Sequence, residues 1–367
     1  MTDSRISKLA KVLVNYSLEL KKGDKFALRA SPNAKELAMA VYEEAIHAGA
    51  YIIYTHNFEE LDELLLKYGT DEQIEFVSPV EKLIVESFDA TIWIGAAINT
   101  RYLSGVDAKR ISQSQKAQAG LTKIFMERSA KKELRWCYTR VPTNADAQDA
   151  NMSLRDYEEF VYGAGMLNEA DPVAFWKAEA EKQRKLINWL KGRDKVVLKG
   201  ENVDVFLSIK DRTFEECAGK VNFPDGEIFT GPVEDSANGW IRFKYPAIYA
   251  GQEINDIELW FENGKIVKER ASKNEELLTA TLNTDAGSRY LGEWGIGTNY
   301  GIQKFTRNML FDEKIGGTIH FAVGASYPET GGRNESGVHW DMLCDMADSE
   351  IIVDGDLFYK NGKPVNN

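Results

Sequence analysis

Apolar positions in the first half of the chain follow two spacings in turn, one typical of helices and one typical of strands. Near the start of the chain, apolar residues recur at the spacing of one helix face, at Ile6, Leu9, Leu13, Tyr16 and Leu20. Short apolar runs of strand length then appear at 25–30, 50–55, 91–95 and 135–142, with helical patterns such as 59–68 between them. Because this order is typical of a mostly parallel sheet covered by helices, we predict an α/β domain over residues 1–192.

Two features refine this first domain. The run AYIIYT at 50–55 is continuously apolar, which predicts a strand covered on both faces. A long helix is expected to end the domain, because Asp171 is a good N-cap, Pro172 suits the first helical position and Gly192 suits the end.

The pattern changes to short strands after residue 192. Segments rich in β-branched and aromatic residues, separated by turn signals, occur at 196–200, 203–209, 239–245, 256–262 and 265–271. Asn263-Gly264 is a hairpin signal between the last two of them, and a single helix is expected near 274–283. We therefore predict a second domain over 193–367 that is mixed α+β and mostly antiparallel.

Composition and charge exclude several classes of protein. The 367 residues are 43% apolar and 28% charged, which is ordinary for a globular chain. Asp and Glu outnumber Lys and Arg by 57 to 45, so the formal net charge is −12. An acidic chain with no basic stripe is a poor candidate for binding nucleic acid or an anionic membrane. No apolar run approaches the ~18 residues that a membrane-spanning helix needs.

The cysteines and the N-terminal residues bear on the compartment. Cys137, Cys217 and Cys344 are far apart and form no CxxC pair, so neither a disulfide framework nor a thiolate zinc site is indicated. The first residues are polar and charged and do not resemble a signal or transit peptide. We expect a cytoplasmic protein.

Two of the four histidines have ordinary structural explanations. His47 lies at the end of a predicted helix, just before Gly49, where a histidine often caps the helix. His56 directly follows an apolar strand. Neither has an acidic neighbour with clear ligand geometry, so a structural role is favoured for both.

His320 lies in the segment GGTIHFAVG, which reads as a strand. Alternation along a strand places His320 and Ala322 on one face and Ile319, Phe321 and Val323 on the other. The imidazole is then held on a rigid element beside a small neighbour, which leaves room for a ligand.

His339 and Asp341 lie two residues apart in GVHWDM, so on a strand their side chains point the same way. Imidazole and carboxylate both suit Zn, Co or Mn, and the pair forms a compact metal-binding unit. An exposed strand with a single His–Asp hydrogen bond would explain the pair equally well.

Two glutamates and a tyrosine occur in segments of similar character. Glu227 follows a turn in FPDGEIFTGP, and Glu293 lies among glycines in LGEWGIGTN. A glutamate in such surroundings is costly to bury unless it is paired or binds a metal, although a turn carboxylate facing water remains the alternative for each. Tyr327 lies in the loop SYPETGG, where a phenol near a metal could donate to a developing oxyanion or simply end a strand.

Four segments in this order, FPDGEIFTGP, LGEWGIGTN, GGTIHFAVGASYPETGG and SGVHWDM, resemble the aminopeptidase T and aminopeptidase S family of two-metal aminopeptidases. The first domain is similar to that family in length and α/β character but carries no specific motif. The resemblance implies hydrolysis of the N-terminal peptide bond of peptides with a free N-terminus. It also implies two divalent ions per subunit (Zn, Co or Mn) and a homodimer in which the first domain has a structural role and helps enclose an internal cavity.

The resemblance assigns roles to particular residues. The positions that match the metal ligands of the family are Glu227, Glu293, His320, His339 and Asp341. Glu293 also matches the general base, which would take a proton from metal-activated water, and Tyr327 matches the catalytic tyrosine. Many relatives have a further ligand glutamate shortly before the first histidine. The nearest candidate here is Glu313, which lies farther from His320, so Asp312 or water are alternatives.

Other functions stay open at this point. A metal-dependent amidase acting on a non-peptide substrate would use the same residue types. A non-catalytic metal- or peptide-binding protein would keep the ligands without turnover, and a purely structural protein would bind no metal. GxSxG, HExxH and phosphate-binding glycine motifs are absent from the sequence, so other hydrolase and nucleotide-binding classes are not indicated.

Overall fold

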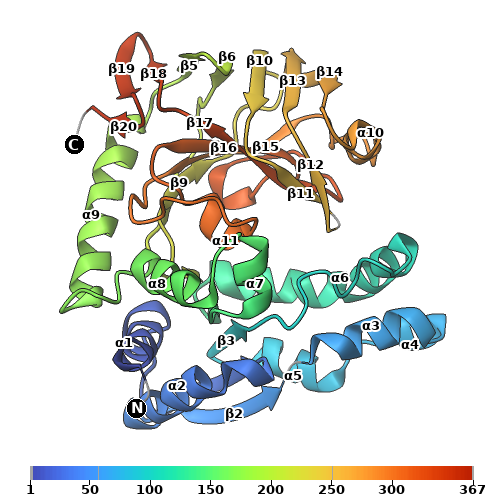
Figure 1. Ribbon diagram of the computed structural model, residues 1–367, viewed down its shortest axis with the longest axis vertical. Coiled ribbons are helices and arrows are strands. Elements are labelled where there is room, and N and C mark those ends of the chain that lie inside the picture. The colour runs from blue at the N-terminus through green and yellow to red at the C-terminus, as the bar shows by residue number, and fades with distance from the viewer. Residues whose placement is uncertain (1–2, 57, 250, 366–367) are drawn as a thin grey trace. The chain divides into compact units, whose positions relative to one another are not determined.

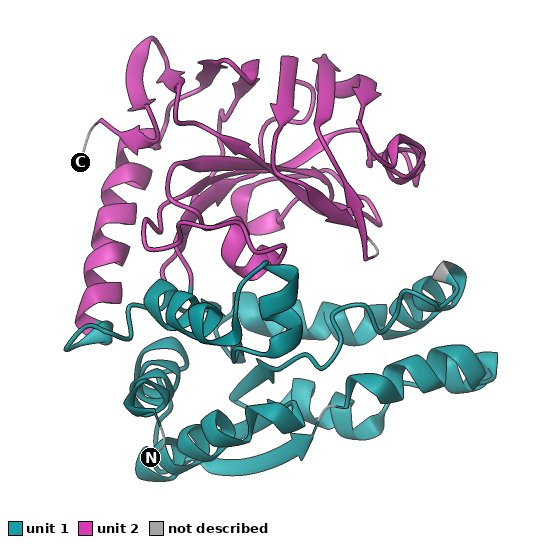
Figure 2. Cartoon of the chain, in the orientation of Figure 1, with its two compact units in different colours: residues 1–173, 219–224 teal, residues 174–218, 225–367 magenta. Residues whose placement is uncertain are grey.

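A computed structural model describes residues 3–56, 58–249 and 251–365 (Figure 1). The chain forms two compact units, Met1–Val173 with Gly219–Pro224 and Ala174–Ala218 with Asp225–Asn367 (Figure 2). The predicted boundary at residue 192 lies inside the second unit. Helix α9 (Pro172–Leu190) accounts for this, because its Leu186 and Leu190 belong to the hydrophobic core of unit 2.

Unit 1 contains a five-stranded parallel sheet in the order β2-β1-β3-β4-β8. The strands are β1 (Lys25–Ala30), β2 (Tyr51–His56), β3 (Ala90–Gly95), β4 (Arg135–Arg140) and β8 (Asn222–Phe223). The helices are α1 (Ser4–Val12), η1 (Leu13–Ser17), η2 (Pro32–Ala34), α2 (Lys35–His47), α3 (Glu59–Tyr68), α4 (Asp71–Ile74), α5 (Pro79–Ser87), α6 (Ala108–Ala130), α7 (Asn144–Asp149) and α8 (Leu154–Ala164). The predicted α/β domain with a parallel sheet is therefore confirmed.

Strand β2 differs from the prediction that both its faces are covered. It is the edge strand of the sheet, and Tyr51 and Tyr54 are 70% and 39% exposed. The inner strands β1 and β3 are almost fully buried, as a parallel sheet under helices requires. The apolar run thus identified a strand, but its place at the edge leaves an apolar surface open on unit 1.

Unit 2 is mostly antiparallel β, as predicted. An eight-stranded sheet has the order β14-β13-β10-β6-β5-β18-β19-β20, and a five-stranded sheet has the order β17-β16-β15-β9-β7. The strands of the larger sheet are β5 (Lys195–Gly200), β6 (Val203–Ser208), β10 (Asn238–Phe243), β13 (Ile257–Glu262), β14 (Lys265–Arg270), β18 (Ser349–Val353), β19 (Asp356–Lys360) and β20 (Lys363–Pro364). Those of the smaller sheet are β7 (Glu215–Cys217), β9 (Glu227–Thr230), β15 (Leu291–Gly297), β16 (Thr318–Gly324) and β17 (His339–Asp345).

Shorter elements complete unit 2. A two-stranded ribbon is formed by β11 (Ala247–Tyr249) and β12 (Gln252–Ile254). The remaining helices are α10 (Glu275–Leu282), α11 (Met309–Asp312) and η3 (Pro328–Thr330). Strands β13 and β14 form the hairpin that the Asn263-Gly264 signal predicts, with both residues at positive φ.

The hydrophobic core of unit 2 contains residues from both of the larger sheets. Phe261 of β13 contacts Phe321 of β16 edge to face, with ring centroids 6.4 Å apart. Trp294 and Ile296 of β15 belong to the same cluster of buried residues as Val205 of β6. One face of the five-stranded sheet is therefore apolar and packed in this core, and the opposite face is not part of the core.

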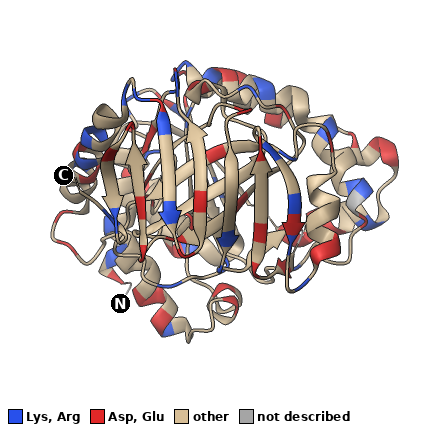
Figure 3. Cartoon of the chain, turned by 90° about the horizontal axis from the view of Figure 1, so that it is seen from above, with Lys and Arg blue, Asp and Glu red and all other residues tan. Residues whose placement is uncertain are grey.

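The outer face of the eight-stranded sheet carries charges of both signs (Figure 3). Strand β6 alternates strictly between buried and exposed residues over Val203–Leu207. Basic and acidic segments are interspersed over the strands seen from above in Figure 3. Within the part of the chain that the structure describes, no helix is both long and apolar enough to cross a membrane.

Candidate metal centre

Four neighbouring strands bring the site residues onto one face of the five-stranded sheet. Strand pairing places Glu293 opposite Ala322, which in turn lies opposite Asp341. His339 pairs with Gly324, and Glu227 pairs with Gly297. Because paired residues share a face, all these side chains lie on the side that is not packed into the core.

Strand alternation explains why this polar face exists. In β15 the core residues Trp294 and Ile296 alternate with Glu293, Gly295 and Gly297. Each core residue fixes its neighbours to the opposite face, because the side-chain period of a strand is two residues. The apolar core thus sets the direction of the ligand side chains.

The first ligand group is formed by Glu227, Glu293 and His320, all of them buried. His320 Nε2 lies 3.0 Å from Glu293 Oε1 and 3.3 Å from Glu227 Oε2. The three side chains come from β9, β15 and β16, so the group depends on the pairing of three strands.

The second group is formed by Glu293, His339 and Asp341. His339 Nε2 lies 3.5 Å from Glu293 Oε2 and 3.6 Å from Asp341 Oδ2. His339 Nδ1 lies 2.8 Å from the carbonyl oxygen of Ala325, which acts as an acceptor and orients the ring. Glu293 is common to both groups, with one carboxylate oxygen facing each histidine.

Burial and like charges shift the ionisation of these residues. Burial raises the pKa of the Glu227 carboxyl to about 8 and that of Asp341 to about 6. Burial alone would lower the pKa of His320, but its hydrogen bond to Glu293 and the nearby carboxylates outweigh burial and raise that pKa to about 10. Such a cluster of opposed, perturbed groups is typical of a functional site.

Tyr327 borders the second group at the start of η3. Its ring lies 5.1 Å from the ring of His339 and 5.4 Å from that of Phe229, measured between centroids. Burial and the carboxylates of the site raise the pKa of the phenol, so its hydroxyl keeps its proton and can donate it in a hydrogen bond.

Glu313 and Asp312 take different places. Asp312 is buried and accepts hydrogen bonds from the backbone N–H and the hydroxyl of Thr306, at 2.7 and 2.9 Å, so it stabilises a loop. Glu313 caps the end of α11 and forms an ion pair with Lys314. Among the described residues, neither belongs to a group with metal-binding geometry.

Lys314, Asp225 and Cys217 lie at this site although sequence reasoning did not select them. Lys314 Nζ is 2.5 Å from Glu227 Oε1 and 3.8 Å from Asp225 Oδ1. Burial disfavours the ammonium, but Glu227, Glu313 and Asp225 outweigh that cost and raise its pKa. A lysine that follows two acidic residues in the sequence is normally interpreted as a solvated surface charge. No local pattern could therefore have identified Lys314 as a residue of the site.

A third ligand group is formed by Cys217, Asp225 and Glu227. Burial, together with the carboxylates, raises the pKa of the Cys217 thiol well above its usual range.

His47 and His56 belong to unit 1, at the ends of α2 and β2, and His56 Nδ1 lies 3.0 Å from the hydroxyl of Tyr54. Neither is part of the groups found among the described residues.

The residues of the first two groups fit divalent metal ions. Their donors are imidazole nitrogens and carboxylate oxygens, which Zn, Co and Mn accept. The buried atoms Glu227 Oε2 and Asp341 Oδ1 have no hydrogen-bond partner within the described structure. Both oxygen atoms are therefore available to bind a cation.

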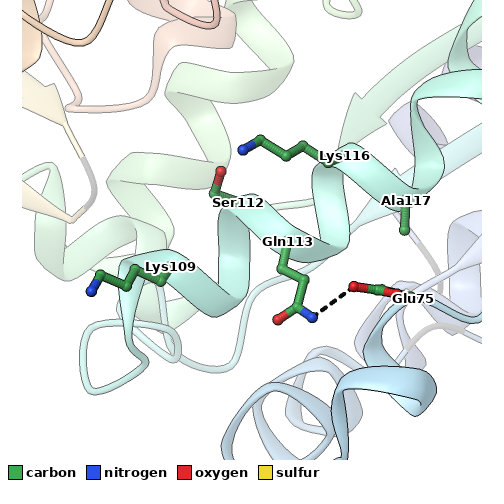
Figure 4. A pocket seen from close by; sticks show the side chains of 6 residues that line it. All are labelled: Glu75, Lys109, Ser112, Gln113, Lys116 and Ala117. Atoms are coloured by element: carbon green, nitrogen blue, oxygen red, sulfur yellow. Dashed lines mark hydrogen bonds between the residues drawn. The ribbon is translucent and has the colours of Figure 1, made fainter.

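A surface hollow in unit 1 offers no comparable chemistry. Lys109, Ser112, Gln113 and Lys116 of α6 line it with Glu75, and Gln113 donates a hydrogen bond to Glu75 (Figure 4). It is open to solvent, and the described residues that line it include no histidine. The candidate site of this protein therefore lies in unit 2.

Comparisons with known proteins identify the family of the chain. The family model described as thermophilic metalloprotease (M29) matches residues 2–363. Aminopeptidase AmpS of Bacillus subtilis is 25% identical, with 98% of each chain covered, and aminopeptidase 2 of Geobacillus stearothermophilus is 26% identical, with 98% of this chain and 95% of that protein covered. The structure of wild-type AmpT from Thermus thermophilus has the same fold, with a TM-score of 0.85 over 99% of each chain at 23% identity. The resemblance seen in the four motifs is confirmed, and the chain belongs to the thermophilic metalloprotease family, as a metal-dependent hydrolase of peptide bonds.

Proposed function

We propose that the chain is an aminopeptidase that hydrolyses the N-terminal bond of peptides at a centre of two divalent metal ions. The observation that carries this proposal is the position of Glu293 between two histidines. Its Oε1 faces His320 at 3.0 Å and its Oε2 faces His339 at 3.5 Å, so one carboxylate serves two ligand groups. Relatives named aminopeptidases over nearly the whole chain support the exopeptidase activity.

The charge of the centre supports two ions. Five carboxylates belong to the ligand groups or pair with Lys314, and they are Asp225, Glu227, Glu293, Glu313 and Asp341. The Lys314 ammonium and two divalent cations would balance these five negative charges when the histidines are neutral. Zn, Co and Mn all suit the donors, and their availability selects among them. Glu227, Glu293 and His320 would hold one ion, and Glu293, His339 and Asp341 the other.

The protein residues have distinct tasks in the proposed hydrolysis. Divalent ions held by these residues would supply Lewis acidity, which lowers the pKa of water towards neutrality. Glu293 takes the proton of the attacking water and later gives it to the leaving amine. The Tyr327 hydroxyl donates a hydrogen bond to the developing oxyanion. The buried setting of Glu293 and His320 limits bulk water at the site and strengthens these interactions.

The proposal is tested by hydrolysis of aminoacyl-p-nitroanilides and short peptides by the purified protein. We expect activity on free-amine substrates that is lost on chelation and returns with Zn, Co or Mn, and no activity on N-acetylated peptides. Equal turnover of blocked and free substrates would favour the amidase alternative. Tight metal binding without turnover of any substrate would favour a binding protein.

A homodimer is the second part of the proposal. Unit 1 exposes large apolar side chains on β2 and the helices next to it in sequence, with Ile46 55%, Tyr51 70% and Tyr68 78% exposed. Exposed apolar residues in such number are typical of a surface that another chain covers. Light scattering should give twice the monomer mass, and Tyr51→Lys should shift the protein towards the monomer. A wild-type monomer at all concentrations would contradict this part.

A cytoplasmic location and the absence of nucleic-acid and membrane partners complete the proposal. The three cysteines are free thiols, which suits a reducing compartment. The net charge of −12 disfavours binding to anionic polymers and anionic lipid surfaces. Cell fractionation and retention on immobilised DNA test these points.

A further inference from the structure

Lys314 is a buried cation that the proposed hydrolysis does not use. Its side chain is 1% exposed, so it cannot contact a substrate from its present position. A buried ammonium is costly unless it is paired. The structure pairs it with Glu227 and Glu313 and places Asp225 Oδ1 3.8 Å from its Nζ.

These contacts place the ammonium beside the third ligand group. Cys217 of β7 lies opposite Glu227 of β9, and Asp225 precedes Glu227 by two residues. One ligand atom from each of the three lies within 4.8 Å of the others, as metal binding requires. Lys314 Nζ contacts the two carboxylates of this group.

The third ligand group differs from the other two in its residues and in its contact with the Lys314 ammonium. The first two groups each contain a histidine and share Glu293. The third contains neither, and its carboxylates are the ones that face the ammonium. A cation of the protein itself thus lies against both carboxylates of a donor set that, with its thiol, suits divalent ions that bind sulfur, such as cadmium and zinc.

We infer that the Lys314 ammonium takes the place of a third metal ion among Cys217, Asp225 and Glu227 and so limits the centre to two ions. Lys314 is then a positioning residue, and the inference rests on the proposed two-metal centre.

This role also explains how Glu227 is presented. Lys314 holds Glu227 Oε1 at 2.5 Å, while Glu227 Oε2 lies 3.3 Å from His320 Nε2 and accepts no hydrogen bond within the described structure. One oxygen of the carboxylate is fixed by the lysine and the other is left for the first ligand group. Glu227 therefore acts as a ligand through a single oxygen.

The test compares metal stoichiometry in metal-free protein reloaded with cadmium. Lys314→Ala removes the ammonium and opens its space, so we expect one more equivalent of cadmium than in the wild type. The extra ion should show the ultraviolet charge-transfer absorption of a cadmium thiolate. The matched control Lys314→Ala/Cys217→Ser should lose that absorption, and Lys314→Arg, which keeps a positive charge, should return to the wild-type number.

The wild type gives an independent reading if Lys314→Ala does not fold. Saturating cadmium should then produce no thiolate absorption, because the ammonium holds the third group. Thiolate absorption in the wild type would overturn the inference, as would equal stoichiometry in wild type and Lys314→Ala. Failure of the proposed function would give a different result, because the wild type would then bind fewer than two ions. The difference in cadmium stoichiometry between Lys314→Ala and the wild type would still decide the role of Lys314.

Discussion

Gly295 of β15 lies directly opposite His320 of β16, and a Cβ on Gly295 would stand 2.0 Å from both Nε2 and Cε1 of the imidazole. The same Nε2 atom faces Glu293 and Glu227. The missing side chain therefore leaves the space that the ring fills. A glycine in the middle of a strand weakens it, and here the close approach of a ligand side chain is the reason for it.

Gly295→Ala should displace His320 and disrupt the first ligand group. We expect loss of one metal equivalent, loss of most activity and a destabilisation of about 1–3 kcal/mol from overpacking. Metal analysis and denaturant unfolding measure these effects. Gly120→Ala on α6 is the matched control, because a Cβ there meets no atom of the described residues within 4 Å. Full metal content in Gly295→Ala would show that the ring has another position available.

Glu293→Gln should affect both ligand groups at once, since Glu293 is the residue they share. We expect kcat to fall by about 10²–10⁴-fold from loss of the general base, together with weaker binding of both ions. The control is Glu329→Gln, the same change at an exposed residue of η3. Retained activity at full metal content would exclude Glu293 as the base.

Tyr327→Phe should separate catalysis from metal binding. The phenol ring stays against His339 and Phe229, so metal content and stability should not change. Loss of one donor to the oxyanion should lower kcat by about 10²–10³-fold with little change in KM. Tyr245→Phe, in which the ring stacked on Phe305 is retained, serves as the control. A change in KM alone would assign Tyr327 to substrate binding.

An ion pair away from the metal centre should make stability depend on pH. Arg289 donates two hydrogen bonds to Glu269, at 2.9 and 3.0 Å, and thereby connects β14 to the segment that enters β15. The hydrogen bonds from Arg289 lower the pKa of Glu269 below its usual value. A lowered folded-state pKa stabilises the protein above the unfolded-state value of about 4.3, and this stabilisation is lost as pH falls through the folded-state pKa.

Glu269→Gln should therefore cost about 1–2 kcal/mol near neutral pH and little below pH ~3, as measured by denaturant unfolding at both values. Glu350→Gln, which breaks the more exposed pair with Lys360, should cost less than about 1 kcal/mol at either pH. Equal losses for Glu269→Gln at both pH values would mean that packing, rather than charge, is responsible.

The local features of the site followed from the sequence. In β16 the alternation of apolar residues with His320 and Ala322 already defined two faces, and His339 and Asp341 were two residues apart on one strand. These relations are local because the two-residue period of a strand is fixed by backbone geometry. The helix-and-strand order of the first half and the hairpin at Asn263-Gly264 depend on the same short-range physics and were confirmed.

Only the tertiary structure decided which distant residues meet. Lys314 and Glu227 are 87 positions apart, and the burial of the lysine depends on carboxylates from other segments that no local pattern links to it. The exposed position of β2 likewise depends on strand order, since an apolar run reads the same at the centre and at the edge of a sheet. The sequence by itself determined the direction of each side chain along its own strand. Strand pairing determined which charges share one buried space, because the energy of a buried charge is set by its neighbours in space.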